Sequence, residues 1–517
     1  MTATSSQPQG EVPGPANQSL SQRLVELRAH LSTRAGLDYT LLRFCVVALV
    51  SIGILMAFSS SMATSLAESG TVWSEAMRQM LLVALGLVAF WVGLRIPPDS
   101  LRKIVPLALV VAVLLLIAVL IPGIGTGRES VGSQSWIVLG PLTLQPSEVA
   151  RVVVGLFGAS ALADKVWNGW KLSNPFLVYA VIAGFMLILI MAQGDIGMAM
   201  SFALVVIFTL AFAGVNWRVF IPIAGLGILG AVLLFFSGGF RSHRFHTYFD
   251  ALRGNIEDTQ GAGFQAYQGF LSLADGGFWG VGLGQSRAKW FYLPEAKNDF
   301  VYAVIGEELG LWGGALVILL FATLGYVGIR TARRARNQYQ ALLAATLTVG
   351  VVSQAFYNIG YVIGLLPVTG IQLPMISAGG TAAIITIGSM GILCNVARHE
   401  PMQVSAMQNF GRPIFDRVLG IPEPRTAPEV IVRGNGRRSR PAASVPNGSS
   451  RTASQPRPRG SAAHEEGERR RRYGRPVTER GQGRSSYRES TSRRESRGAE
   501  APRVRRDPRI RHRSRGE

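Results

Sequence analysis

The sequence predicts an all-α polytopic membrane protein with about ten transmembrane helices, a large extracytoplasmic loop between spans seven and eight, and a disordered basic C-terminal tail. Of its 517 residues, 48% are hydrophobic and only 16% are charged. Apolar runs fill the region from about Leu41 to Ala397, whereas both ends of the chain are polar. Several of these runs reach the roughly 20 residues that a helix needs to cross a bilayer.

The apolar runs give the spans in order along the chain. We expect them at about 41–61, 77–96, 104–121, 147–163, 175–193, 196–213, 218–236, 301–329, 341–364 and 377–397. The fifth and sixth spans are joined by a very short link. Both cysteines, Cys45 and Cys394, lie inside apolar spans, so we expect buried small hydrophobes rather than a disulfide or a thiolate metal site.

Lys and Arg set the predicted orientation, because cytoplasmic loops hold them in excess. Every other loop is basic, beginning with the N-terminal arm. Residues 1–38 are therefore predicted to be a cytoplasmic arm, 39–400 a ten-span membrane domain with an extracytoplasmic loop at about 237–300, and 401–517 a disordered Arg-rich cytoplasmic tail. The chain is then a multi-pass protein of the cytoplasmic (inner) membrane with both termini inside the cell, and the loops that hold Asp195 and Asp299 face outward.

The tail carries most of the positive charge. Residues 401–517 contain 28 Arg and no Lys against 12 acidic residues, a net charge of +16 out of +21 for the chain. Because Ser, Gly, Pro and Arg dominate, the segment cannot bury enough apolar surface to offset its ordering entropy. We expect it to bind anionic lipid headgroups or an acidic cytoplasmic protein. Nothing beyond charge favours a nucleic-acid partner.

The long outward loop has the composition of a ligand site. Its cations Arg241, Arg244 and Lys289 occur among clustered glycines that allow close backbone approach. Such a loop would suit a phosphate group. A flexible loop whose cations contact lipid headgroups explains the same composition equally well.

Asp299 lies where this loop meets the eighth span. An ionised carboxylate at a membrane border is poorly solvated and therefore costly, so an acid at this position is a functional candidate. It is flanked by Lys289 and Lys297 and lies nearer to water than the two acids that follow it, so a catalytic role is favoured. For Glu307 and Glu308, deeper in the span, the preferred interpretation is a structural ion pair with an inward-facing cation.

A second outward loop runs into the fourth span through Gln145-Pro-Ser147-Glu148. Its proline fits the first turn of a helix, where the missing N–H is not needed. Glu148 and Arg151 are spaced i, i+3 and can pair on one helix face. Embedded charges of this kind indicate either a polar cavity or a structural bridge. Asp195 adds a further outward acid in the link between spans five and six.

Four segments together resemble a known family. They are 145–148 (Gln-Pro-Ser-Glu), 292–296 (Tyr-Leu-Pro-Glu-Ala), 299–310 (Asp-Phe-Val-Tyr-Ala-Val-Ile-Gly-Glu-Glu-Leu-Gly) and 358–382, which begins Asn-Ile-Gly-Tyr and contains Pro-Val-Thr-Gly-Ile-Gln-Leu-Pro-Met-Ile-Ser377-Ala-Gly-Gly. The chain is similar here to the SEDS (shape, elongation, division and sporulation) family, the FtsW/RodA/SpoVE-type peptidoglycan glycosyltransferases. The resemblance covers about 41–400 and implies the ten-span fold of that family.

The resemblance also implies an activity and a partner. Family members are thought to polymerise lipid II at the outer membrane face with an aspartate at the position of Asp299, beside a class B penicillin-binding protein that crosslinks the strands. The chain departs from the family at five motif positions, where it has Ser135, Arg151, Gly194, Lys297 and Asn298 instead of the usual Arg, Lys, Pro, His and Thr. The carboxylates are retained.

The chemistry of such a polymerase suits one carboxylate. Forming a β-1,4 bond from an α-linked polyprenyl diphosphate inverts the anomeric carbon, which requires a single base opposite the leaving group. Asp299 would take the proton of the acceptor hydroxyl, or would hold a divalent cation such as Mg²⁺ or Mn²⁺. The residues expected to bind the substrate or its diphosphate are Arg241, Arg244, Lys289, Lys297, Gln145, Ser147, Glu148, Arg151, Asp195 and Ser377.

Other functions are open on sequence alone. A lipid II flippase could route its substrate past Glu148, Arg151 and Asp195, and a non-catalytic scaffold could act through the tail. Within the family, long polar extensions at both ends favour a division-type polymerase at the septum over a rod-type elongation polymerase.

Overall fold

The computed structural model describes residues 35–424 apart from 129–131, 141, 168, 170, 172, 216–217, 219, 223–224 and 226–262. All of these residues belong to one compact unit that ends at Glu429. The predicted loop cations Arg241 and Arg244, the predicted seventh span (almost entirely) and the N-terminal arm up to residue 34 lie outside the described residues.

Helices dominate the described chain. The long helices are α2 (Leu37–Ser69), α3 (Ser74–Arg95), α4 (Pro98–Ala118), α6 (Pro146–Leu162), α7 (Pro175–Ala192), α8 (Ile196–Phe212), α12 (Val301–Arg334), α13 (Gln338–Val362) and α14 (Thr381–Arg398). Seven of them, all except α6 and α8, are long and apolar enough to cross a membrane. The two exceptions are 17 residues long and coincide with the predicted fourth and sixth spans. The polytopic α-helical prediction is confirmed, and the count of ten stays a prediction.

The helix ends follow from the local sequence. Pro98, Pro146 and Pro175 each occupy the first turn of a helix, where a missing N–H costs nothing. Asp195 caps α8 by accepting from the Met198 N–H at 3.0 Å, and Asn337 caps α13 in the same way.

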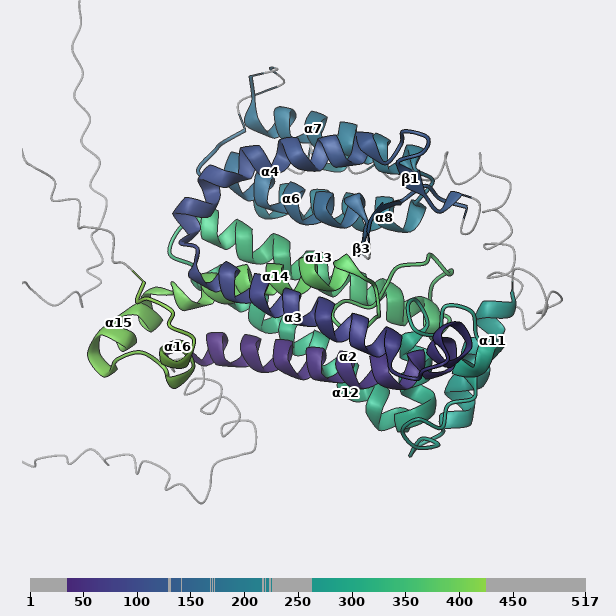
Figure 1. Ribbon diagram of the computed structural model, residues 1–517. Helices are drawn as coiled ribbons and strands as arrows, with labels where there is room; N and C mark the ends of the chain where they lie inside the picture. Colours follow the sequence, from purple (N-terminus) through teal and green to yellow (C-terminus); the bar gives the residue numbers. More distant parts are fainter. Residues whose placement is uncertain are drawn as a thin grey trace, which may run out of the picture. The chain divides into compact units, whose positions relative to one another are not determined.

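The long helices form two groups (Figure 1). In one group α14 packs on α3, and α12 packs on both α13 and α2. In the other, α6 packs on α4, α7 and α8. Contacts of α13 with α6 and α8 join the groups. The α3–α14 contact is close because Gly391 faces the Phe90 carbonyl, where a Cβ would collide with it.

Short elements lie between the helices. A small antiparallel sheet has the order β1-β2-β3, with β1 at Gly125–Thr126, β2 at Trp136–Leu139 and β3 at Leu142–Leu144. The register of β2 and β3 pairs Val138 with Thr143. Helix α11 (Phe264–Gly276) and the π-helical turn η1 (Ala288–Tyr292) precede α12.

Helix α12 is broken near its beginning. Gly310 has φ 67° and ψ −164°, a conformation that favours glycine, and it separates two helical parts. The carbonyls released by the break accept from the turn after α11: the Val281 N–H bonds Glu307 O at 2.9 Å and the Gly282 N–H bonds Glu308 O at 3.1 Å. The break is therefore stabilised by a loop that is distant in sequence.

The tail does not begin at residue 401, which corrects the predicted boundary. Residues 401–424 contain helices α15 (Pro401–Phe410) and α16 (Ile414–Val418). Asp416 is fully buried and accepts from the Arg398 guanidinium and the Tyr39 hydroxyl, both at 2.6 Å. These tertiary contacts order a stretch whose composition alone looked like tail, and residues 425–517 are outside the described part.

Candidate functional site

Asp299 lies in the turn that leads into α12, and its side chain is partly exposed. Its carboxylate faces the connection between α13 and α14, here called the 363–380 loop. A Cβ added at Gly370 would lie 3.5 Å from Oδ2 of Asp299, and Gly370 itself has φ 76°. That distance is an ordinary van der Waals contact, so Gly370 lies directly beside the Asp299 carboxylate, and its positive φ is what favours glycine at this position.

The backbone before Asp299 is held by the same region. The Asp299 carbonyl accepts from the Asn358 amide at 2.8 Å and from the Tyr361 hydroxyl at 2.9 Å. The preceding carbonyl, of Asn298, accepts from the Ser377 hydroxyl at 2.6 Å. The four sequence segments that carried the family resemblance thus include two that meet directly in space.

Lys297 extends away from this turn to helix α3. Its ammonium lies 3.4 Å from a carboxylate oxygen of Glu75, and both side chains are about a quarter exposed. A partly exposed ion pair of this kind contributes little to stability. The Lys297 ammonium could therefore leave Glu75 for another anion with little loss of folding free energy. Its predicted contact with a diphosphate stays a prediction.

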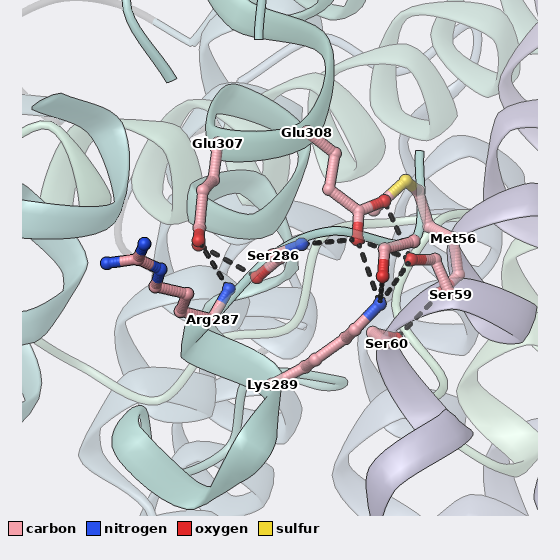
Figure 2. Close-up of polar contacts among 9 residues, drawn as sticks. Met56, Ser59, Ser60, Ser286, Arg287, Lys289, Glu307 and Glu308 are labelled. Carbon is pink, nitrogen blue, oxygen red and sulfur yellow. Dashed lines mark hydrogen bonds and ion pairs between the residues drawn. The ribbon is translucent and has the colours of Figure 1, made fainter. Parts of the chain in front are cut away.

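A buried polar cluster lies beside the break in α12 (Figure 2). The Lys289 ammonium lies 3.3 Å from Glu308 and 3.4 Å from the Ser59 hydroxyl, and it also donates to the Gly284 carbonyl at 2.5 Å. Lys289 and Glu308 have fully buried side chains. Ser59 donates to the Glu308 carboxylate, so α2, η1 and α12 meet here. The ion pair predicted for Glu308 is confirmed.

The other two predictions for this cluster need revision. Glu307 has no cationic partner side chain among the described residues, contrary to expectation, because the Ser286 hydroxyl and the Arg287 N–H donate to it at 2.8 and 2.6 Å. Lys289 is not a loop cation open to a phosphate, because all three of its N–H donors have partners inside the protein. Binding a diphosphate would require this cluster to open.

The second predicted cluster is also buried. Arg151 pairs with Glu148 at 2.6 Å, which confirms the i, i+3 pair, and the Gln354 amide donates to the other Glu148 oxygen at 2.9 Å. Arg151 also donates to the Gly350 carbonyl at 2.5 Å. Of the two interpretations left open, these contacts favour the structural bridge between α6 and α13.

Gln145 and Asp195 meet next to that bridge. The Gln145 amide donates to Asp195 at 3.0 Å, while Asp195 caps α8. Burial raises the pKa of the Asp195 carboxyl, and the hydrogen bonds from the Met198 N–H and the Gln145 amide oppose the shift. Ser147, the second residue of α6, is fully buried.

The 363–380 loop brings the predicted segments together. Gly197, two residues after Asp195, packs on the Thr369 carbonyl, so the start of α8 touches one side of the loop. Thr381 at the end of the loop donates to the Thr143 carbonyl at 2.9 Å, just before Gln145. Asp299 touches the loop at Gly370. The loop is therefore shared by the Gln145, Asp195 and Asp299 segments.

Sequence reasoning missed Asn358 and Tyr361 as members of the site. Asn358 is fully buried in α13, and a polar amide inside a predicted span is itself a signal of function. The Glu75 partner of Lys297 was also missed, because residues 222 positions apart give no local pattern.

Comparisons with known proteins agree on one family. A family model described as cell cycle protein, for FtsW, RodA and SpoVE, matches residues 39–402. The probable peptidoglycan glycosyltransferase FtsW of Mycobacterium tuberculosis is 38% identical over 398 residues, which cover 76% of this chain and 74% of that protein. Stage V sporulation protein E of Bacillus subtilis is 35% identical over 370 residues, covering 72% and 100% of the two chains.

Solved structures share the fold at low identity. A chain from a peptidoglycan synthase complex that coordinates polymerization and crosslinking has a TM-score of 0.55 and 22% identity, covering 70% of this chain and 97% of that chain. The rod shape determining protein RodA of Thermus thermophilus has a TM-score of 0.51 and 22% identity, covering 70% and 96%.

Proposed function

The chain belongs to the FtsW/RodA/SpoVE family of cell cycle proteins, and from this premise we propose that it is a peptidoglycan glycosyltransferase that polymerises lipid II at the outer face of the cytoplasmic membrane. Relatives at 38% identity bear the name peptidoglycan glycosyltransferase FtsW, which supports this activity and a role in cell division. The septum is the proposed place of action, and both termini are proposed to be cytoplasmic.

The observation that carries the proposal is the setting of Asp299. A partly exposed carboxylate stands on a turn whose carbonyls are held by side chains, and it faces Gly370 of the 363–380 loop. A general base needs this combination, because it must reach the proton that it removes and must stay oriented toward it.

The reaction can be written from this geometry. The Asp299 carboxylate takes the proton from the acceptor sugar's 4-hydroxyl as the hydroxyl oxygen forms a bond to the donor's anomeric carbon. The bond from that carbon to the diphosphate oxygen breaks, and the polyprenyl diphosphate leaves with the electron pair. A single attack from the face opposite the leaving diphosphate inverts the configuration of the anomeric carbon, so no second carboxylate is needed as a nucleophile.

The leaving diphosphate needs positive charge rather than a proton. Lys297 is the described cation nearest in sequence to Asp299, and Arg241 and Arg244 remain predicted contributors from outside the described residues. A divalent cation on Asp299 also remains a prediction. Among the described residues no three His, Cys, Asp or Glu side chains gather to hold a metal, so no step is assigned to one.

The partners follow from the same premise. A class B penicillin-binding protein is the proposed crosslinking partner, and the solved complex that unites polymerization with crosslinking supports such an arrangement. Residues 425–517 are proposed to bind anionic lipids or cytoplasmic division proteins, because they carry 26 Arg against 10 acidic residues.

Purified protein tests the proposal. With fluorescent lipid II and a cognate class B penicillin-binding protein, the wild type should form glycan polymer and Asp299→Ala should not. The same proteins in liposomes test the flippase alternative: polymer-free transport of lipid II that survives in Asp299→Ala would favour a transporter. The closed bridge of Glu148, Arg151 and Gln354 gives no support to a substrate route through the bundle.

A further inference from the structure

We propose that Asn358, Tyr361 and Ser377 are positioning residues that fix the backbone in front of α12 and thereby aim the Asp299 carboxylate. The inference rests on the proposed function and deepens it. None of the three side chains is assigned to the reacting atoms.

Three consecutive main-chain carbonyls in front of α12 each accept a hydrogen bond from the segments that face them. Lys297 O accepts from the Ala378 N–H at 3.0 Å. Asn298 O accepts from Ser377, and Asp299 O accepts from Asn358 and Tyr361. Carbonyls at a helix entrance usually bond within the helix or to water, so side-chain donors to successive residues fix the backbone of the turn. An aspartate has only two side-chain torsions, so a fixed backbone confines its carboxylate to a small region.

Asn358 and Tyr361 also fix the opposite wall. The Asn358 amide and the Tyr361 hydroxyl each lie 2.7 Å from the Ile371 carbonyl. Ile371 follows Gly370, the residue beside the Asp299 carboxylate. One pair of side chains therefore sets the distance between the carboxylate and the loop that it faces.

Donor counting shows why these residue types are needed. The Asn358 amide offers two N–H groups and Tyr361 one O–H, three protons for the five contacts that link them to the Asp299 and Ile371 carbonyls and to one another, so the Tyr361 proton serves one carbonyl at a time. Reversing the amide would set its oxygen against two carbonyl oxygens, so the surroundings dictate its orientation. An aspartate at position 358 would have the same shape but would lose these donors.

Ser377, near the C-terminal end of the 363–380 loop, also holds the backbone of the turn before α12. Its hydroxyl accepts from the Leu373 N–H at 2.8 Å and uses its single proton for Asn298 O. The side chain is buried. The geometry thus assigns Ser377, a predicted substrate ligand, to holding the backbone instead.

The test compares variants that remove one hydroxyl each. Tyr361→Phe keeps the ring, which packs edge-on against Phe300, and Ser377→Ala removes the other hydroxyl. Tyr339→Phe is the matched control, because Tyr339 is equally buried on the same helix but its hydroxyl has no hydrogen-bond partner among the described residues. Each purified variant is assayed for lipid II polymerisation with the penicillin-binding protein partner, and its thermal unfolding is recorded.

The two site variants should lose roughly 10- to 100-fold in kcat, the effect of misplacing a catalytic group by about 1 Å. Their KM for lipid II and their melting temperature should stay near those of Tyr339→Phe. Ser377→Thr, which retains the hydroxyl, should recover most of the lost kcat. Asn358→Asp should be the most impaired of the series.

Full kcat in both Tyr361→Phe and Ser377→Ala would overturn the proposal. So would a loss of kcat that only follows the fraction of folded protein, or equal losses in Tyr339→Phe. Asp299→Asn is measured in parallel. If it is active, the catalytic assignment of Asp299 fails, whereas an inactive Asp299→Asn beside fully active Tyr361→Phe and Ser377→Ala refutes only the positioning role.

Discussion

Buried charges at the scale of single residues are held in pairs with extra hydrogen bonds. Glu148–Arg151 joins α6 to α13 with Gln354, and Lys289–Glu308 joins η1 to α12 with Ser59. A charge in a low-dielectric interior is tolerated when an opposite charge and further hydrogen bonds offset its lost hydration; of the Arg151 donors only Nε has no hydrogen-bond partner among the described residues. Each pair joins elements of the fold, and a role of these residues in binding substrate stays a prediction.

Lys289→Met should lower the free energy of unfolding by about 3–5 kcal/mol, because it leaves the Glu308 carboxylate buried without its cation. Unfolding of the purified protein in detergent measures the loss. Adding Glu308→Leu removes both charges and should recover much of the stability. Lys297→Met, whose ion pair with Glu75 is partly exposed, should change stability by less than about 1 kcal/mol. Equal stability of Lys289→Met and the wild type would contradict the pairing.

The sequence could predict some of these residue-scale features and not others. The i, i+3 spacing of Glu148 and Arg151 predicts their pair, because both lie on one helix. Lys289 among glycines looked like a phosphate-binding cation, and its burial depends on Ser59, which is 230 positions away. The burial of a loop cation is decided by tertiary contacts that no local pattern contains.

Two elements of the fold depend on contacts between distant segments. Helix α12 breaks at Gly310 because the turn after α11 supplies N–H donors to its released carbonyls. Helices α15 and α16 form because Asp416 is bound by Arg398 and Tyr39. Apolar periodicity predicts where the spans lie but not the break or these added helices, since both depend on partners elsewhere in the chain.

Gly310→Ala should destabilise the protein by about 1–3 kcal/mol, because its positive φ is strained for alanine and a Cβ would meet the Gly280 backbone. Polymerisation should fall as well, since the first part of α12 carries the turn with Asp299. The control is Gly184→Ala on α7, where nothing lies within 4 Å of the added Cβ and the helix should gain slightly. Unfolding curves that coincide for the two variants would argue against a strained break.

At the scale of the whole molecule, we propose separate roles for the membrane unit, which polymerises, and the Arg-rich segment, which binds lipids or proteins. The described unit contains the proposed site, and residues 425–517 carry 26 Arg against 10 acidic residues. Composition predicts the membrane class and the basic segment well. It placed the boundary at 401, too early, because the contacts of Asp416 with Arg398 and Tyr39 order part of the segment.

Removing residues 425–517 should leave polymerisation in detergent within about twofold of the full chain, because the site and the α15–α16 contacts remain. Binding to vesicles that contain anionic lipid should weaken, by about 1 kcal/mol for each Arg that reaches the surface. Co-flotation with anionic and neutral vesicles measures this. Undiminished flotation of the truncated protein on anionic vesicles would contradict the lipid-binding role.

The central claim, that Asp299 is the base for glycan polymerisation, is tested most directly by Asp299→Asn. The asparagine keeps the shape and cannot accept the proton, so polymer formation from fluorescent lipid II should fall by roughly 10²- to 10⁴-fold. Asp164→Asn, at an exposed residue with φ 61° that asparagine tolerates, should polymerise like the wild type. Wild-type rates of polymer formation by folded Asp299→Asn would contradict the account.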